Sequence, residues 1–161
     1  MTDPSPGPAA PPLAPFLHAL SAARFAAFRL RPGEDPVLAL REVQRRTGAR
    51  AIAVVTCVGS LTRAEIRHAN RPGGTRYRGH FEITSLTGTV DPVGEHLHLT
   101  IADGEGHAFG GHLLPGSAVY TTAEIVVALL DDLSFTRAPC ALSGYDELVI
   151  HADPTPKDPA A

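Results

Sequence analysis

Three of the eight histidines stand in two short motifs whose spacing could hold a metal ion. One residue separates His96 from His98, and His112 follows the pair Gly110-Gly111. Residues two apart in a strand point to the same face, about 7 Å apart along the backbone, so both imidazoles can converge on one ion. Three neutral imidazoles with an open fourth position suit zinc, which prefers tetrahedral nitrogen and sulfur ligands. Such an ion could be structural or could activate water.

The length of the turn between the two motifs decides whether the third imidazole joins the first two. Residues 103–106, Asp-Gly-Glu-Gly, predict a turn between antiparallel strands. A four-residue loop would place His112 opposite Leu97, on the wrong face, whereas a three-residue loop would place it opposite His98. A bulge at Gly110-Gly111 would make the same one-residue correction. The simpler alternative is that the His-x-His pair is hydrogen-bonded and binds no metal.

Two carboxylates interrupt apolar strand patterns. Glu82 lies between Phe81 and Ile83, and Glu124 lies within an Ala- and Val-rich run. Burial of an unpaired carboxylate is costly, so each is expected to be paired, solvent-facing or beside a cation. Either could line a cleft between subunits. Beside a zinc ion, either could also transfer a proton in catalysis.

Five arginines surround one predicted strand-turn-strand and are the candidates for nucleic-acid contact: Arg63, Arg67, Arg71, Arg76 and Arg78. The chain as a whole has 14 Lys and Arg against 17 Asp and Glu, a formal charge of −3. This balance argues against a surface organised mainly to neutralise phosphates. The arginine run therefore has two interpretations, a solvated face or a local DNA-binding patch.

The elements that position these residues belong to a single predicted domain. With 161 residues, the chain is long enough for one domain with a real core. Nine of the 15 prolines fall near the two ends, which predicts disordered tails over residues 1–15 and 153–161 and a folded domain over 16–152. No apolar run approaches the roughly 20 residues of a membrane-spanning helix, so no membrane partner is expected.

One helix and a series of strands are predicted within this domain. Asp35 can cap a helix over Pro36–Thr47, and Gly48 can end it. Period-two patterns and short apolar runs between turn residues, including a turn at Gly59-Ser60, then predict mostly antiparallel strands. The expected strands are residues 24–30, 49–58, 61–68, 77–86, 96–101, 107–114, 123–130 and 147–151.

The two cysteines, Cys57 and Cys140, are too few for a disulfide framework. Cys57 stands in an apolar run and is predicted to be a buried thiol. No charged-then-apolar leader of the secretory type is recognised in the sequence. We therefore expect a reducing, cytoplasmic location.

A series of short segments also follows the order found in a known family. They are residues 29–35, 58–61, 79–88, 96–99, 103–104, 110–113 and 122–126. Together they resemble the plants-and-prokaryotes-conserved (PPC) domain, over nearly the whole chain between the proline-rich ends. His80 stands where plant members commonly carry arginine, and Asn70-Arg71-Pro72-Gly73 lacks the core of an AT-hook.

The resemblance implies an α+β fold, mainly an antiparallel β-sheet with a flanking helix, assembling as a homotrimer. It also implies that the histidines matching His96, His98 and His112 form a metal site, usually taken as zinc. We therefore expect a cytoplasmic, homotrimeric binding or regulatory protein with zinc as cofactor, whose ligand is a small molecule or a protein partner. A zinc-dependent enzyme acting on a small molecule and a DNA-binding or transcription-associated protein are the alternatives.

Overall fold

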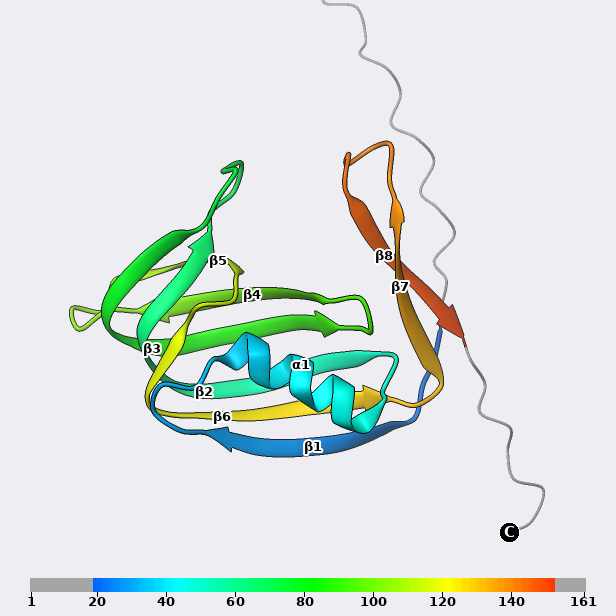
Figure 1. Cartoon of the computed structure of the whole chain (residues 1–161), viewed down its shortest axis with the longest axis horizontal. Coiled ribbons are helices and arrows are strands. Elements are labelled where there is room, and N and C mark those ends of the chain that lie inside the picture. The colour runs from blue at the N-terminus through cyan, green and yellow to red at the C-terminus, as the bar shows by residue number, and fades with distance from the viewer. Residues whose placement is uncertain (1–18, 153–161) are drawn as a thin grey trace, which may run out of the picture.

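The computed structural model describes residues 19–152 and contains one helix and eight strands in that range (Figure 1). The predicted tails, residues 1–15 and 153–161, lie outside the described residues, as do residues 16–18. The elements are β1 Ala23–Leu30, α1 Pro36–Thr47, β2 Ile52–Arg67, β3 Thr75–Val90, β4 Glu95–Ala102, β5 Ala108–Leu113, β6 Ala118–Leu130, β7 Leu133–Pro139 and β8 Asp146–Ala152.

The main sheet has six strands in the order β1-β6-β2-β3-β4-β5, and every neighbouring pair is antiparallel. The far end of β2 also pairs with β5, through Ile66 with Leu113 and Arg67 with His112. Strands β2, β3, β4 and β5 therefore form a closed ring of pairings, and the sheet curls (Figure 1). The predicted fold class, a mainly antiparallel sheet with one helix, is confirmed.

Helix α1 begins and ends where the sequence predicted. One carboxylate oxygen of Asp35 accepts a hydrogen bond from the Val37 backbone N–H at 2.8 Å, and Gly48 ends the helix with a left-handed φ of 64°. The helix buries Val37 and Leu40 in the main core. The other Asp35 oxygen accepts from the Gly116 N–H, so the cap also ties the helix to the turn before β6.

The turn predicted at Gly59-Ser60 is wrong, because β2 continues through it as one 16-residue strand with local register shifts. Gly59 has a φ of 145° and lies so close to β6 that a Cβ there would meet the Thr122 carbonyl oxygen. The glycine marks a close approach of two strands, which the sequence pattern does not distinguish from a turn.

Strands β7 and β8 pair only with each other and stand as an arm beside the main sheet (Figure 1). Strand β8 contains the predicted strand 147–151, whereas β7 was not predicted. At the base of the hairpin, Leu133 and Phe135 bury their side chains with Ala51. In the described part of the chain, no helix is long and apolar enough to cross a membrane.

Candidate metal centre

Strand β4 alternates strictly between the core and the surface. Leu97, Leu99 and Ile101 are at most 2% exposed, while His96 and His98 are exposed on the opposite face. Burial of the three apolar side chains fixes the orientation of the strand, because a one-residue slip would exchange the two faces. The two imidazoles are thereby held side by side on the outer face.

The turn between β4 and β5 has three residues, 104–106. This is the loop length that the sequence analysis required for His112 to lie opposite His98. The Asp103 N–H donates to the His107 carbonyl, the Gly106 N–H donates to the Asp103 carbonyl, and Gly106 takes a φ of 85°. The resulting register places His112 opposite His98, and the β4–β5 pairing contains no shift. The bulge considered at Gly110-Gly111 is therefore not what aligns the histidines.

The two glycines serve instead to let β5 fit between β4 and β2. A Cβ on Gly110 would lie 2.1 Å from the Leu99 carbonyl oxygen, and one on Gly111 would lie 2.7 Å from the Arg67 carbonyl oxygen. Side chains at these positions would push the neighbouring strands away. The glycines thus permit the close pairing that carries His112 to the other two histidines.

The three imidazoles converge on one point. One nitrogen from each of His96, His98 and His112 lies within 4.8 Å of the others, and the Nε2 atoms of His96 and His98 are 3.2 Å apart. The 3.2 Å separation is close to that of two ligands on one zinc ion, whose bonds to imidazole nitrogen are about 2.0–2.1 Å long. The Nδ1 atom of His112 is buried and has no hydrogen-bond partner among residues 19–152. A buried polar atom without a partner calls for an explanation, and a metal ion bound by these histidines would supply one.

The local environment favours neutral imidazoles. Burial lowers the pKa of His96, and the nearby His98 and Arg137 lower it further. Burial also lowers the pKa of His112, with Arg67 as the next cause. A neutral imidazole is the form that coordinates a metal, so these two side chains need not lose a proton near neutral pH.

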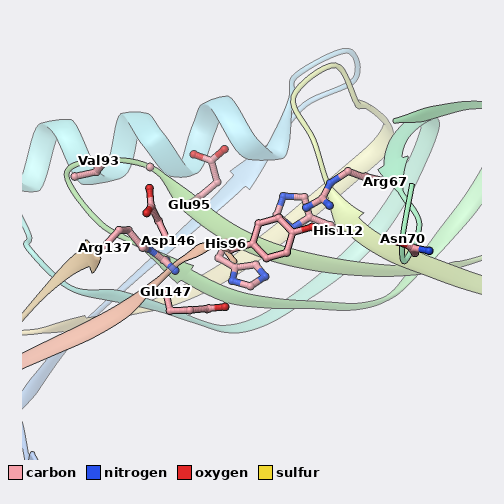
Figure 2. Close-up of a pocket in the computed structure, with 11 residues that line it drawn as sticks. Arg67, Asn70, Val93, Glu95, His96, His112, Arg137, Asp146 and Glu147 are labelled. Atoms are coloured by element: carbon pink, nitrogen blue, oxygen red, sulfur yellow. The ribbon is translucent and has the colours of Figure 1, made fainter. Parts of the chain in front are cut away.

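A cavity of about 500 Å³ opens beside the histidines (Figure 2). Its walls come from the main sheet and from the β7–β8 hairpin, and they include Arg67, His96, His112, Arg137, Asp146 and Glu147. Sequence reasoning identified the two histidines and singled out Arg67 for another role. It missed the last three, because no sequence motif indicates where the hairpin docks.

Comparison with known proteins shows to which family this fold belongs. The sequence profile of the Plants and Prokaryotes Conserved (PCC) domain matches residues 18–131. The chain belongs to this family. It is the family named above as PPC, so the expected resemblance is confirmed. The matched region contains the whole six-stranded main sheet and all three histidines, and it ends before the β7–β8 hairpin.

Among similar proteins, the bifunctional protein GlmU of Synechococcus sp. (strain JA-2-3B'a(2-13)) is 43% identical over 131 residues, which is 81% of this chain but 20% of that protein. The chain thus spans about a fifth of this relative's length. A hypothetical protein from Salmonella has a solved structure with 44% identity and a TM-score of 0.81, covering 84% of this chain and 99% of that one.

A more distant structure shares the PCC fold. It is the metal-containing protein AF0104 from Archaeoglobus fulgidus, with 22% identity and a TM-score of 0.68, covering 83% of this chain and 99% of that one. At this identity, the likeness shows the fold alone.

The two candidate carboxylates lie on the main sheet but away from the histidine cavity. Glu82 is exposed on β3 opposite Ala102, which is four residues along β4 from His98, or about 13 Å at the rise of a strand. Glu124 is exposed on β6 and pairs across the sheet with Arg29 on β1 and Val58 on β2. The structure places neither in the histidine cavity.

The five candidate arginines lie at one end of the β2–β3 pairing, where Arg63 is the cross-strand partner of Arg78 and Glu65 that of Arg76. Arg63 donates to the Gly116 carbonyl and Arg76 pairs with Glu65 at 2.7 Å. Arg67 lines the histidine cavity. Arg71 and Arg78 are exposed. Nucleic-acid contact through these arginines stays a prediction.

Proposed function

We propose that this PCC protein is a homotrimeric binding or regulatory protein that holds a zinc ion with His96, His98 and His112. The observation that carries the proposal is the convergence of three imidazoles, one of which has a buried Nδ1 atom that finds no hydrogen-bond partner in the described part of the chain. When bound, zinc would supply a Lewis acid with an open position for a ligand oxygen or nitrogen. The adjacent cavity gives a small molecule access to that position.

The donor chemistry supports zinc over the hard cations magnesium and calcium. All three candidate ligands are imidazole nitrogens, whereas magnesium and calcium prefer oxygen ligands. The described residues offer no other cluster of three or more potential ligands. The archaeal fold relative is described as metal-containing, but the proposal for this chain rests on its own side chains.

The decisive test is elemental analysis of the purified protein beside two histidine variants. We expect about one zinc per chain in the parent protein and a loss of most of it in His98→Ala, because two imidazoles bind zinc far more weakly than three. The matched control is His80→Ala, which removes an exposed histidine of β3 that contacts Tyr120. Zinc-free parent protein, or equal zinc in both variants, would contradict the proposal.

Association into a trimer is supported by an apolar outer face on β1, β2 and β6. Phe25 and Val58 are 67% and 58% exposed there, beside a hollow of about 450 Å³ that includes Glu124. Exposed apolar patches of this kind mark interfaces. Glu124 then lies in a cleft between subunits, where the neighbouring Arg29 can balance its charge.

Light scattering tests the trimer. The parent protein should have three times the chain mass of 16.9 kDa, and Val58→Lys should reduce it by placing a charge in the apolar contact. Leu142→Lys provides the control, because Leu142 is equally apolar and 86% exposed but lies at the hairpin tip. A monomeric parent protein would remove the trimer from the proposal.

A further inference from the structure

We propose that the histidine cavity binds a small carboxylic acid that also carries a hydroxyl or amino group. Arg67 would receive the carboxylate beside the metal, and Glu147 on the β7–β8 hairpin would accept the hydrogen bond from the other group. This inference deepens the function proposed above and rests on it. It assigns specificity to residues outside the three-histidine set.

The hairpin wall is fixed to the strand that carries the metal ligands. Arg137 on β7 pairs with Asp91 at 3.2 Å, and the Asp91 side chain is fully buried. The other Asp91 oxygen accepts from the backbone N–H groups of Val93 and Gly94. Asp91 therefore ties the hairpin to the turn that leads directly into His96. A binding wall needs this kind of support to keep its side chains in place.

Among the cavity-lining residues in the described range 19–152, the ion pairs leave one cation, Arg67, available for a ligand. Arg137 is balanced by Asp91, and Glu95 is balanced by Arg41 at 2.6 Å. Arg67 is half-buried, and among residues 19–152 no carboxylate lies within ion-pair distance of it. A partly buried arginine without a counter-ion favours an anionic ligand.

Arg67 is also placed to act together with the metal. It is the cross-strand partner of His112 in the β2–β5 pairing, and Figure 2 shows the two side chains next to each other at one end of the cavity. The planar guanidinium can donate two parallel hydrogen bonds to a carboxylate. A carboxylate there would contact both Arg67 and an ion held by the histidines.

The opposite wall presents hydrogen-bond acceptors. Asp146 and Glu147 are exposed carboxylates at the start of β8 and line the cavity. Figure 2 shows Glu147 on the His96 side, away from Arg67. Carboxylates accept hydrogen bonds and repel anions, so this wall favours a hydroxyl or ammonium group on the ligand. The cavity of about 500 Å³ is in the range of small-molecule sites.

The test measures binding of lactate, alanine and acetate to protein loaded with cobalt in place of zinc. The visible cobalt spectrum reports a ligand entering the metal's coordination shell without any need for turnover, and titration gives the Kd. We expect lactate or alanine to change the spectrum and to bind more tightly than acetate, which lacks the second polar group. Lactate against alanine distinguishes a hydroxy acid from an amino acid.

Two variants test which wall of the cavity binds which group of the ligand. Arg67→Gln should raise the Kd for all three acids about tenfold or more, because a charged hydrogen-bonded pair is lost. Glu147→Gln should not weaken acetate binding, because it removes a repelling charge, and it should reduce the preference for the acid with the second polar group. Arg71→Gln is the control, since Arg71 is exposed and does not line the cavity.

Metal content, measured on every sample, separates the two proposals. Full metal loading with no response to any of the three acids would overturn this inference and leave the zinc centre standing. Equal Kd values in Arg67→Gln and the parent protein would also overturn it. Failure of the parent protein to bind cobalt or zinc would instead overturn the metal centre on which it rests.

Discussion

The two walls of the histidine cavity are built in different ways. The wall formed by β4 and β5 is part of the main sheet, where β5 pairs on both sides and β4 is fixed by buried leucine and isoleucine side chains. The β7–β8 wall pairs only with itself, and residues 141–147 at its tip are all exposed. The three candidate metal ligands thus lie on the heavily supported wall, and the acidic side chains lie on the lightly supported one.

This difference separates two properties that a binding site needs. Metal ligands must keep their mutual positions within a fraction of an ångström, which strand pairing provides. A wall that selects a ligand can differ between relatives without disturbing those positions. The PCC profile ends at residue 131, before the hairpin, so the wall that we propose to select the ligand lies outside the residues that match the family.

The largest effect is expected from cutting the contact between the walls. Asp91→Ala removes the ion-pair partner of Arg137 and two turn hydrogen bonds, which should cost about 3 kcal/mol in urea denaturation. Hydrogen exchange should speed up across 133–152 more than in β4 and β5. Asp146→Ala, at an exposed site, is the control and should cost less than about 0.5 kcal/mol. Equal loosening of both walls would contradict the distinction.

A second prediction concerns only the wall that carries the three histidines. Gly110→Ala forces a Cβ against the Leu99 carbonyl, so β5 should move away from β4 at a cost of about 2 kcal/mol. Zinc content should fall because His112 moves with β5. Gly104→Ala, where a Cβ would meet nothing within 4 Å, should retain both stability and zinc. Full zinc in Gly110→Ala would show that the wall is more adaptable than proposed.

Lowering the pH should destabilise the metal-free protein through the wall that carries the histidines. The folded pKa values of His96 and His112 lie below the ordinary value near 6.5, mainly because of burial. As pH falls through that value, the unfolded chain takes up protons first, so the metal-free protein loses stability. We expect the Tm to fall by a few degrees between pH 7.5 and 5.5.

The matched variants locate this acid response. His96→Gln should flatten the dependence of Tm on pH, because one of the histidines with a lowered pKa is gone. His151→Gln, on the exposed part of β8, should retain the parent slope. Identical slopes in all three proteins would assign the acid response to some other group.

The last prediction compares the two thiols. Their modification should affect stability least, but the two should differ clearly in reactivity. Cys57 is buried in the sheet, and burial raises its pKa to about 11. Backbone N–H groups of Ser143 and Leu142 lower the pKa of Cys140 in the hairpin turn. At pH 8, a thiol reagent should modify Cys140 first, as mass spectrometry can locate. Equal rates would mean that the sheet opens as readily as the hairpin.

The sequence predicted those features that depend on neighbours along the chain. Helix α1 was predicted at both ends because Asp35 and Gly48 act within one turn of it. The three histidines were predicted as a group because strand periodicity gives the face of each residue. The loop length was undecided, since a three-residue and a four-residue turn fit the same Asp-Gly-Glu-Gly string, and a bulge at Gly110-Gly111 was the other way to align His112.

Features that depend on distant segments were missed. Gly59 was misread because the strand that approaches it, at Thr122, is more than sixty residues away. Arg137 and Glu147 join the cavity because the hairpin docks on the main sheet, through the buried Asp91 carboxylate and through its own apolar base. Asp91 itself reads as an ordinary turn residue in the sequence.

The three-residue turn between β4 and β5 has a consequence for how this gene can change. Because side chains alternate along a strand, one added or deleted residue among 104–106 would turn His112 toward the core and bring the buried Leu113 to the surface. Two added residues would restore the original faces. A single-codon insertion here should therefore be more harmful than a substitution at the same place, and surviving length changes should come in even numbers.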